Sequence, residues 1–462
     1  MGVLQNLIPR SQTPTIAVFN TLNWPRSGLI ETFIDNEMLP ADKGFRIIDA
    51  ETGESIAAQK LTSRQEGSYW ALWAKEVPPL GFKCYRILSL DEKVQAGVPE
   101  VKNEPVLENA YYRLQVDPHT GAIRSLLDKE TGAELVDGNS PWQLGQFIYE
   151  KLNGDRNTFR GDFLRSSLQE VKVEPQADGP VWKGLLIKVE AEGLQLGSGF
   201  QCEVRLYETE KRIELIYRGR KLPVNAPEAV YIAFPFALRD SRTLYECQGG
   251  MVTPGVGQIP RSASDWQAIQ NYALLQGQEG QIVWGSRDIP LVQLGDINLG
   301  KWMETTEIKK PHLYSWVMNN YWFTNFLAKQ EGELVWRYYL TSHPDHNPAA
   351  AARFGWGSAV PLAVRVLAPG VAAEQKPSFA GLADWPDNVL MVSSRPARNG
   401  GGVVLQLRET AGRTAKLPVA NLLSVRQNAS AAIINVLEEN VQPVHQQIDF
   451  IPYQMKMIKV EW

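Results

Sequence analysis

The sequence predicts an all-β protein with little helix, and three observations support this prediction. Short runs rich in Val, Ile, Tyr, Phe and Trp alternate with turns rich in Gly, Pro, Asn and Asp. No long segment keeps the apolar period of 3.6 residues that an amphipathic helix requires. The 462 residues include 29 prolines and 37 glycines, which fit many short strands joined by turns.

Strand-like runs recur along the whole chain. They cover residues 15–19, 45–50, 69–74, 83–88, 112–116, 184–192, 201–207, 212–218, 229–234, 334–340, 360–367, 389–392 and 403–407. Between them, residues 117–121 form a predicted turn in which Gly121 takes the position that needs a positive φ. Similar turns end at Gly53 and Gly132, so we expect repeated hairpins.

Two linker-like stretches divide the chain into three predicted domains. Residues 90–105 are polar with two prolines, and residues 368–385 are rich in Ala, Pro and Gly. The predicted domains are residues 1–97, 98–370 and 371–462. The middle block is too large for a small sandwich, which favours a two-sheet structure with many strands in each sheet.

Composition and charge exclude several classes of partner. The chain carries 47 basic and 51 acidic residues, for a net charge of −4, so no nucleic-acid partner is expected. No apolar run reaches the length of a membrane-spanning helix, and the N-terminus lacks the pattern of a signal peptide. The odd number of widely spaced cysteines, three, favours buried thiols in a reducing compartment, and we expect a cytoplasmic protein.

The histidines give little support for a metal site. His343 and His346 flank Asp345 closely enough to share an ion, but Pro344 and Pro348 place them in a loop and no third ligand is evident. A structural or solvated loop is therefore the favoured interpretation, and no residue is assigned to a metal or to catalysis.

One segment combines aromatic rings with side-chain amides. In residues 316–326, the candidate sugar-binding side chains are Asn319, Asn320, Tyr321, Trp322 and Asn325. Amides can donate to and accept from sugar hydroxyls, and aromatic faces cover the C–H side of a sugar ring. A buried strand whose amides bond neighbouring backbone explains the same pattern, and composition alone does not separate the two.

A second candidate pairs a carboxylate with an indole. Asp265 and Trp266 stand side by side in residues 264–270. The pair could bind a sugar hydroxyl and stack on a sugar ring, but an ordinary strand start is the favoured explanation.

Several segments resemble the C-terminal half of glycoside hydrolase family 38, the retaining α-mannosidases. The most specific is Leu-Glu-Asn-Ala-Tyr-Tyr-Arg at 107–113, followed by Asp-Pro-x-x-Gly-x-Ile-x-Ser-Leu-x-Asp-Lys at 117–129. The others are Val-Phe-Asn-Thr-Leu-Asn-Trp-Pro-Arg at 18–26, Val-Pro-Pro-Leu-Gly-Phe at 77–82, and residues 314–326 and 339–343. The resemblance extends from about residue 18 to the end and is weakest over the last 80 residues.

The resemblance implies a fold and a substrate class. The fold is a galactose-mutarotase-like β-supersandwich over residues 98–370, flanked by smaller β-sandwiches over 1–97 and 371–462. The substrates would be α-mannosides or related glycosides. In the family, an N-terminal α/β barrel supplies the aspartate nucleophile and most ligands of a zinc ion. No such motif occurs here, so we expect no cofactor in this chain, zinc only in the complete enzyme, and a missing N-terminal catalytic domain as partner.

Three functions follow from these observations. In the first, the chain is the carbohydrate-contacting and structural C-terminal region of an α-mannosidase-type hydrolase and is inactive alone. In the second, it is a stand-alone carbohydrate-binding module. In the third, it is an epimerase or lyase on a mutarotase-like fold, which would need an acid/base pair, and His312 is the only histidine near the aromatic segment.

Overall fold

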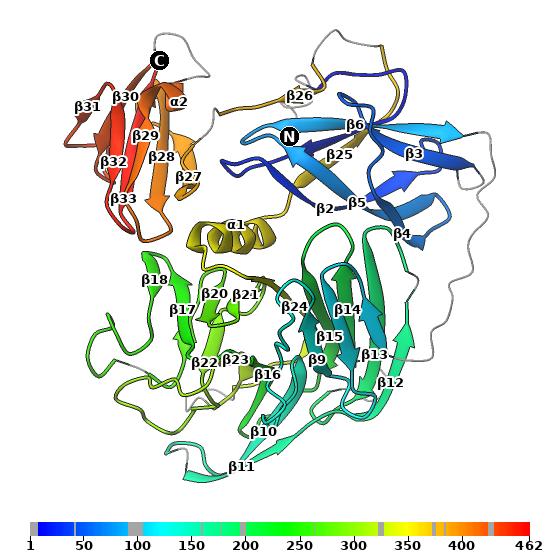
Figure 1. The fold of residues 1–462 in the computed structure, drawn as a ribbon, viewed down its shortest axis with the longest axis vertical. Helices are drawn as coiled ribbons and strands as arrows, with labels where there is room; N and C mark the ends of the chain where they lie inside the picture. The colour runs from blue at the N-terminus through cyan, green and yellow to red at the C-terminus, as the bar shows by residue number, and fades with distance from the viewer. Residues whose placement is uncertain are drawn as a thin grey trace.

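Three β-rich parts surround one helix in the computed structural model (Figure 1). The structure describes residues 8–40, 43–90, 105–158, 160–176, 178–194, 200–262, 264–321, 328–371, 376–382, 385–423 and 429–462. The N-terminal part lies at the upper right of the figure, the C-terminal part at the upper left and the large middle part below. The predicted all-β fold, a large supersandwich flanked by smaller β domains, is confirmed.

The N-terminal part is a sandwich of two antiparallel sheets. One sheet contains β25 (Ala363–Leu367), β1 (Thr15–Phe19), β6 (Phe82–Leu90), β26 (Ser378–Phe379) and β3 (Gly44–Asp49), and the other contains β2 (Arg26–Asp35), β5 (Gly67–Val77) and β4 (Ala58–Ser63). Ile16, Ile30, Leu72 and Tyr85 are buried in the core of this part. Strand β1 is buried along its whole length because it lies between β6 and β25.

The chain returns to this first sandwich after the middle part. Strand β25 pairs with β1, from Thr15 opposite Leu367 to Phe19 opposite Ala363, and β26 pairs with β6. The predicted boundary between residues 370 and 371 therefore falls within a stretch whose strands belong to the N-terminal sheet.

The middle part is the supersandwich, built from a six-stranded and a nine-stranded antiparallel sheet. The six-stranded sheet has the order β11 (Arg160–Ser166), β10 (Gln146–Asp155), β16 (Glu228–Pro235), β23 (His312–Asn319), β22 (Leu291–Leu294) and β19 (Gln267–Ala268). The nine-stranded sheet has the order β12 (Gln169–Pro175), β13 (Trp182–Glu190), β14 (Phe200–Tyr207), β15 (Ile213–Lys221), β24 (Gly332–His343), β21 (Gly280–Ser286), β20 (Ala273–Gly277), β17 (Arg242–Cys247) and β18 (Gly250–Val252). A small sheet of β7 (Val106–Glu108), β8 (Tyr112–Val116) and β9 (Ile123–Asp128) completes it.

One hydrophobic core joins both large sheets and the small one. It includes Tyr112 from β8, Phe147 from β10, Tyr217 from β15 and Trp284 from β21. Burying these large rings supplies much of the driving force for folding, at about 25 cal/mol per Å² of apolar surface. The three predicted turn glycines, Gly53, Gly121 and Gly132, all have positive φ, at 76°, 68° and 72°, which confirms those turns.

The C-terminal part has its own core. A five-stranded sheet of β27 (Val389–Pro396), β28 (Gly402–Glu409), β33 (Met455–Glu461), β30 (Ser430–Ile434) and β31 (Gln442–Val444) faces the pair β29 (Ala415–Pro418) and β32 (Gln447–Phe450), and helix α2 (Val419–Leu423) follows β29. Leu407, Leu417, Phe450 and Ile458 are buried in this core.

Helix α1 (Pro348–Ala359) lies where the three parts meet (Figure 1). Asn347 caps its start by accepting a hydrogen bond from the backbone N–H of Ala350 at 3.1 Å, and Pro348 occupies the first turn. At the other end, Nη1 of Arg26 donates to the carbonyl oxygens of Gly357 at 3.0 Å and Val360 at 2.6 Å. The N-terminal sandwich thus binds the end of a helix that lies 331 positions further along the chain.

The C-terminal part is fixed to the supersandwich by a buried ion pair. Arg408 on β28 pairs with Glu246 on β17, and their side chains are only 2% and 1% exposed. Trp356 of α1 donates its indole N–H to the same Glu246 carboxylate at 2.7 Å. Glu246 on β17 is therefore bound both by Arg408 on β28 and by Trp356 on α1.

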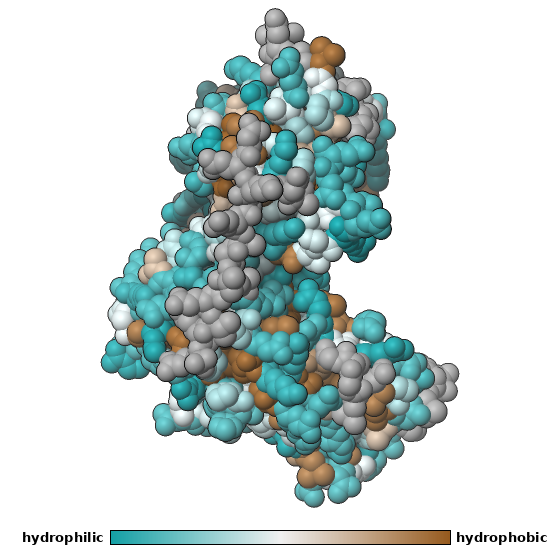
Figure 2. All heavy atoms as spheres, turned by 90° about the vertical axis from the view of Figure 1, so that its right-hand side faces the viewer, coloured by the Kyte–Doolittle hydropathy of each residue, from teal (hydrophilic) through white to brown (hydrophobic). Residues whose placement is uncertain are grey.

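The surface turned toward the viewer in Figure 2 is mostly hydrophilic over the N-terminal sandwich, and hydrophobic atoms gather in the lower half, over the supersandwich.

None of the helices in the described part of the chain is long and apolar enough to cross a membrane. All three cysteines, Cys84, Cys202 and Cys247, carry free thiols.

Candidate functional site

The outer face of the six-stranded sheet, opposite the main core, carries a second cluster of aromatic side chains. We call it the outer aromatic cluster, and its rings come from Trp142, Tyr231, Trp266, Trp316, Tyr314, Phe163 and Tyr321. Trp316 stacks on Tyr231 with ring centroids 6.3 Å apart and an angle of 6°, and Trp266 lies 5.3 Å from Trp316. The sequence-predicted residues Trp266 and Tyr321 are therefore brought into one cluster.

A β-bulge decides which face Asn319 occupies. In the pairing of β16 with β23, Tyr231 lies opposite Trp316 and Val230 opposite Met318, so Val317 is the extra residue. Beyond this bulge Asn319 lies opposite Ala229, a member of the outer aromatic cluster. Because directly opposed residues share a face, the bulge turns Asn319 to the same side as Trp316.

A buried carboxylate organises the rings of the cluster. Glu150 is fully buried and accepts hydrogen bonds from the hydroxyls of Tyr321 at 2.8 Å and Tyr231 at 3.3 Å. Arg165 supplies the compensating charge, with Nε 2.6 Å from the same carboxylate. Burial, with the Glu150 charge acting in the same direction, raises the pKa of both tyrosines well above the ordinary value, so their hydroxyls stay protonated donors.

Asn320 is buried, and its amide is used by the backbone. Its Oδ1 accepts the N–H of Glu228 at 2.6 Å, and its Nδ2 donates to the carbonyls of Val224 and Ala226, both at 2.8 Å. By contrast, the amide of the half-buried Asn319 makes no hydrogen bond within the described part of the chain. Asn319 is therefore the better placed of the two for an external contact. Trp322 and Asn325 lie outside the described residues.

Asp265 holds a neighbouring loop in a strained conformation. Its carboxylate accepts the backbone N–H of Trp302 at 3.1 Å and of Met303 at 2.8 Å, and Asp265 itself is 6% exposed. Trp302 has a φ of +54°, which costs a residue other than glycine about 1–3 kcal/mol. The two hydrogen bonds to Asp265 offset this cost and present an indole that is 68% exposed.

The sequence reasoning missed Trp302. The loop that carries it covers the cluster with Ile297 and Leu299, and Gln293 anchors this loop by accepting the N–H of Leu299 at 3.0 Å. In the sequence, Trp302 follows the turn residue Gly300 and precedes several polar residues, so it has no aromatic neighbours to draw attention to it. An isolated indole in a polar loop was the available signal.

The predicted residues form two groups at opposite ends of β23. Strand β19 pairs with β22 so that Asp265 lies beyond the Leu294 end, and Leu294 lies opposite Leu313 near the start of β23. Asn319 ends β23, six residues beyond Leu313 and about 20 Å away at 3.3 Å per residue. Asp265 and Asn319 therefore belong to separate surfaces joined by the buried cluster.

Part of the supersandwich matches a known family in sequence. Residues 107–281 match the family description "Glycosyl hydrolases family 38 C-terminal domain". These residues form a family 38 C-terminal domain. The resemblance predicted from the motif at 107–129 is thereby confirmed for this part of the chain.

Two solved structures share the fold of nearly the whole chain. An α-mannosidase from Enterococcus faecalis V583 aligns over 99% of this chain and 57% of its own, with 12% identity and a TM-score of 0.69. A protein in glycosyl hydrolase family 38 from Enterococcus faecalis aligns over 99% and 59%, with 12% identity and a TM-score of 0.70. This chain thus spans less than three fifths of the length of both proteins.

Two further comparisons complete these findings. A galactose mutarotase-like protein from Lactobacillus casei aligns over 53% of this chain and 100% of its own, with 12% identity and a TM-score of 0.34. No curated protein matches the chain in sequence.

The family 38 match covers only part of the candidate site. Asp265, Trp266 and Glu150 lie within residues 107–281, whereas Trp302 and Asn319 follow the matched stretch. The anchor of the strained loop is therefore inside the matched part of the family 38 domain, and the exposed indole that it holds is beyond it.

The family 38 domain offers no cluster of metal ligands in its described residues. Nowhere in the described part of the chain do three or more His, Cys, Asp or Glu side chains gather in a way that could hold a metal ion. His346, one of the two histidines considered from the sequence, lies with Nε2 2.9 Å from the carbonyl of Gly277 and 3.1 Å from that of Gly280.

Proposed function

We propose that this chain is the carbohydrate-contacting and structural β-region of an α-mannosidase-type glycoside hydrolase. The complete enzyme would hydrolyse α-mannosides or related glycosides, with its nucleophile and zinc ligands in an N-terminal catalytic domain that acts as partner of this region. The match of residues 107–281 supports the family, and the fold shared with an α-mannosidase supports the substrate class. The free, buried thiols of Cys84 and Cys202 fit a reducing compartment such as the cytoplasm.

The observation that carries the sugar-contacting role is the exposed indole of Trp302. A large, exposed ring held by two hydrogen bonds in a strained backbone is typical of a binding position, because strain of this kind is retained where function requires a fixed geometry. An indole face covers the C–H side of a sugar ring. We extend the proposal to the second surface, where the half-buried Asn319 would contact the substrate.

The first test is hydrolysis of an aryl α-mannoside by the purified chain, with and without added zinc. We expect no turnover in either condition, because retaining hydrolysis needs a positioned pair of carboxyl groups and the proposal assigns these to another domain. Turnover that copurifies with the chain through several chromatographic steps would contradict the proposal and place catalytic residues in this sequence.

Trp302→Ala tests the sugar contact itself. In titrations with methyl α-D-mannoside followed by NMR, we expect weak, roughly millimolar binding to the wild type and a further loss of about 3- to 10-fold in the variant. Trp462→Ala, which removes a 48% exposed indole from the C-terminal part, is the matched control and should leave binding unchanged.

Two results of this titration would redirect the proposal. Equal binding by wild type and Trp302→Ala would remove the loop from the site. Binding at about 1 μM by the isolated chain would instead favour a stand-alone carbohydrate-binding module, because such a module needs no second domain to complete its site.

A further inference from the structure

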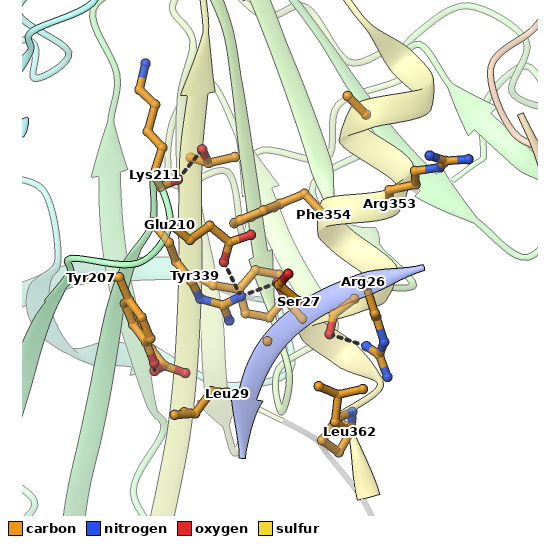
Figure 3. Close-up of a pocket in the computed structure, with 18 of the residues that line it drawn as sticks. Arg26, Ser27, Leu29, Tyr207, Glu210, Lys211, Tyr339, Arg353, Phe354 and Leu362 are labelled. Atoms are coloured by element: carbon orange, nitrogen blue, oxygen red, sulfur yellow. Dashed lines mark hydrogen bonds and ion pairs between the residues drawn. The ribbon is translucent and has the colours of Figure 1, made fainter. Parts of the chain in front are cut away.

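A cavity of about 430 Å³ lies where the family 38 domain meets the N-terminal sandwich and α1 (Figure 3). Its walls come from the start of β2, the turn between β14 and β15, the ends of β21 and β24, and α1. In Figure 3, Glu210 and Tyr339 lie near Phe354 of α1, and Ser27 lies below them beside the β2 ribbon. The volume falls in the range of ~300–1,000 Å³ that small-molecule sites occupy.

Positive charge predominates in the wall of this cavity. Five cationic side chains line it, namely Arg26, Lys211, Arg212, Arg287 and Arg353. The carboxylates in the wall are Glu210 and Glu214. A cleft lined mostly by one sign of charge concentrates ligands of the opposite sign.

Most of this positive charge is not matched by a carboxylate inside the cavity. Lys211 is neutralised from outside by Asp128 at 2.8 Å and Glu130 at 2.7 Å. Within the described part of the chain, Arg26 and Arg287 form no ion pair. Arg26 is 8% exposed, one of its terminal nitrogens has no hydrogen-bond partner, and burial lowers its pKa to about 10. Arg353 also forms no ion pair with any residue that the structure describes, but Figure 3 shows it pointing away from Glu210.

Arg212 lines the cavity beside three aromatic rings. Its guanidinium carbon lies 5.5 Å from the ring centroids of Tyr207, Tyr339 and Phe354, and Nη1 donates to Ser358 at 3.0 Å. The nearest carboxylate is Glu210 at 3.7 Å, which is longer than a hydrogen bond, and Nε is buried without a partner. Arg212 is therefore held by the three rings and by Ser358 but keeps an unused donor at Nε.

Arg287 lines the same cavity as Arg212. Burial raises the pKa of the Tyr339 hydroxyl, and the charges of both arginines oppose that rise. The backbone N–H of Arg287 pairs with Arg337 in the sheet, whereas its exposed guanidinium is free to turn toward a ligand. Two guanidinium groups in the wall of one cavity supply several N–H donors of the kind that bind the oxygens of an oxyanion.

We infer that this cavity binds the anionic group of a small molecule, a phosphate or a carboxylate, between Arg212 and Arg287. The anion would offset the unpaired positive charge of the wall, which is costly in a partly buried site. Glu210 would compete with it for Arg212. This site is separate from the sugar-contacting surface around Trp302 and does not depend on the proposed function.

Calorimetric titration at low salt with inorganic phosphate, malonate and methyl α-D-mannoside tests this inference. We expect saturable binding of phosphate, malonate or both, and none of the neutral glycoside at this cavity. Arg287→Gln should weaken anion binding about tenfold or more, because one charge-assisted hydrogen bond is lost. Glu210→Gln should strengthen it, because the competing carboxylate is removed.

The control removes the same charge at a position away from the cavity. Arg220→Gln removes the same charge from β15 at the end remote from the cavity, where Arg220 is 56% exposed, and should leave binding unchanged. Arg212→Gln is a supporting variant, and Arg287→Gln decides the outcome if Arg212→Gln fails to fold. Absence of saturable anion binding by the wild type, or equal weakening in Arg287→Gln and Arg220→Gln, would overturn the inference. Binding of phosphate alone or malonate alone identifies which anionic group the site prefers.

Discussion

Replacing Arg408 by methionine is expected to lower the free energy of unfolding by about 3–5 kcal/mol at pH 8. The variant leaves the Glu246 carboxylate, which is 1% exposed, without its counter-charge between the supersandwich and the C-terminal part. It also removes the hydrogen bonds that Arg408 donates to the carbonyls of Cys247 and Gln248, both at 3.1 Å. Urea unfolding followed by tryptophan fluorescence measures the change.

The loss should depend on pH with a definite sign. Burial raises the pKa of Glu246, and Arg408 and Trp356 oppose that rise. Without Arg408 the folded protein binds a proton at a pH where the unfolded chain is still ionised. Stability of the variant therefore increases as the pH falls from 8 toward 5, and decreases as the pH rises through the folded-state pKa.

Two controls isolate the buried charge as the cause. Arg408→Met combined with Glu246→Gln should recover part of the lost stability, because no unpaired charge remains. Arg413→Met breaks the pair with Asp387 in the same part of the molecule, but both side chains are more than half exposed, so a change of about 0–1 kcal/mol is expected. A loss in Arg408→Met that is independent of pH would argue for lost packing alone.

Asn320→Ala is expected to lower the free energy of unfolding by about 3 kcal/mol. The amide makes three hydrogen bonds to backbone groups, and each buried group left unpaired costs about 1 kcal/mol or more. Urea unfolding measures the loss of stability. Mannoside binding should fall only in proportion to the fraction of the variant that is unfolded.

Asn319→Ala is the matched control for this prediction. It removes the same amide one residue earlier, where no backbone group depends on it, so stability should change by less than about 0.5 kcal/mol. If Asn320→Ala unfolds like the wild type while sugar binding falls, its amide serves a ligand and the structural interpretation is wrong.

The strands could be predicted from the sequence because their signals are local. Residues 15–19 and 112–116 were expected as strands and form β1 and β8 with those bounds. The turn glycines were predictable for the same reason, since a positive φ depends on the residue itself. The family followed from the motif at 107–129, which lies in the matched part of the chain.

Helix α1 was not predicted, and its surroundings explain why. It contains Ala349, Ala351, Ala352, Gly355 and Trp356 among its buried residues, because three parts of the molecule pack around it. A helix that is covered from several sides has no polar face, so its sequence lacks the apolar period used to recognise helices. Asn347 and Pro348 were the local start signals that remained.

The candidate site was only partly predictable. Asp265 was singled out as a possible sugar ligand, but its carboxylate binds the backbone of Trp302 and Met303, which lie 37 and 38 positions away. The cavity around Arg212 gathers side chains from β2, β15 and α1, and nothing in the sequence relates these distant segments. Contacts of this kind depend on how complete domains pack together.

The return of β25 to the N-terminal sheet has a consequence for synthesis on the ribosome. Strand β1 needs β25 on one side, and the chain from Leu90 to Ala363 must be made before that partner exists. At ~5–20 residues synthesised per second, this edge of β1 lacks its partner strand for tens of seconds. During this time the supersandwich can fold first, while an apolar strand edge stays exposed to pairing with other chains. Nascent chains of this protein should therefore depend on chaperones until β25 emerges, and translation arrested before residue 363 should leave an aggregation-prone product.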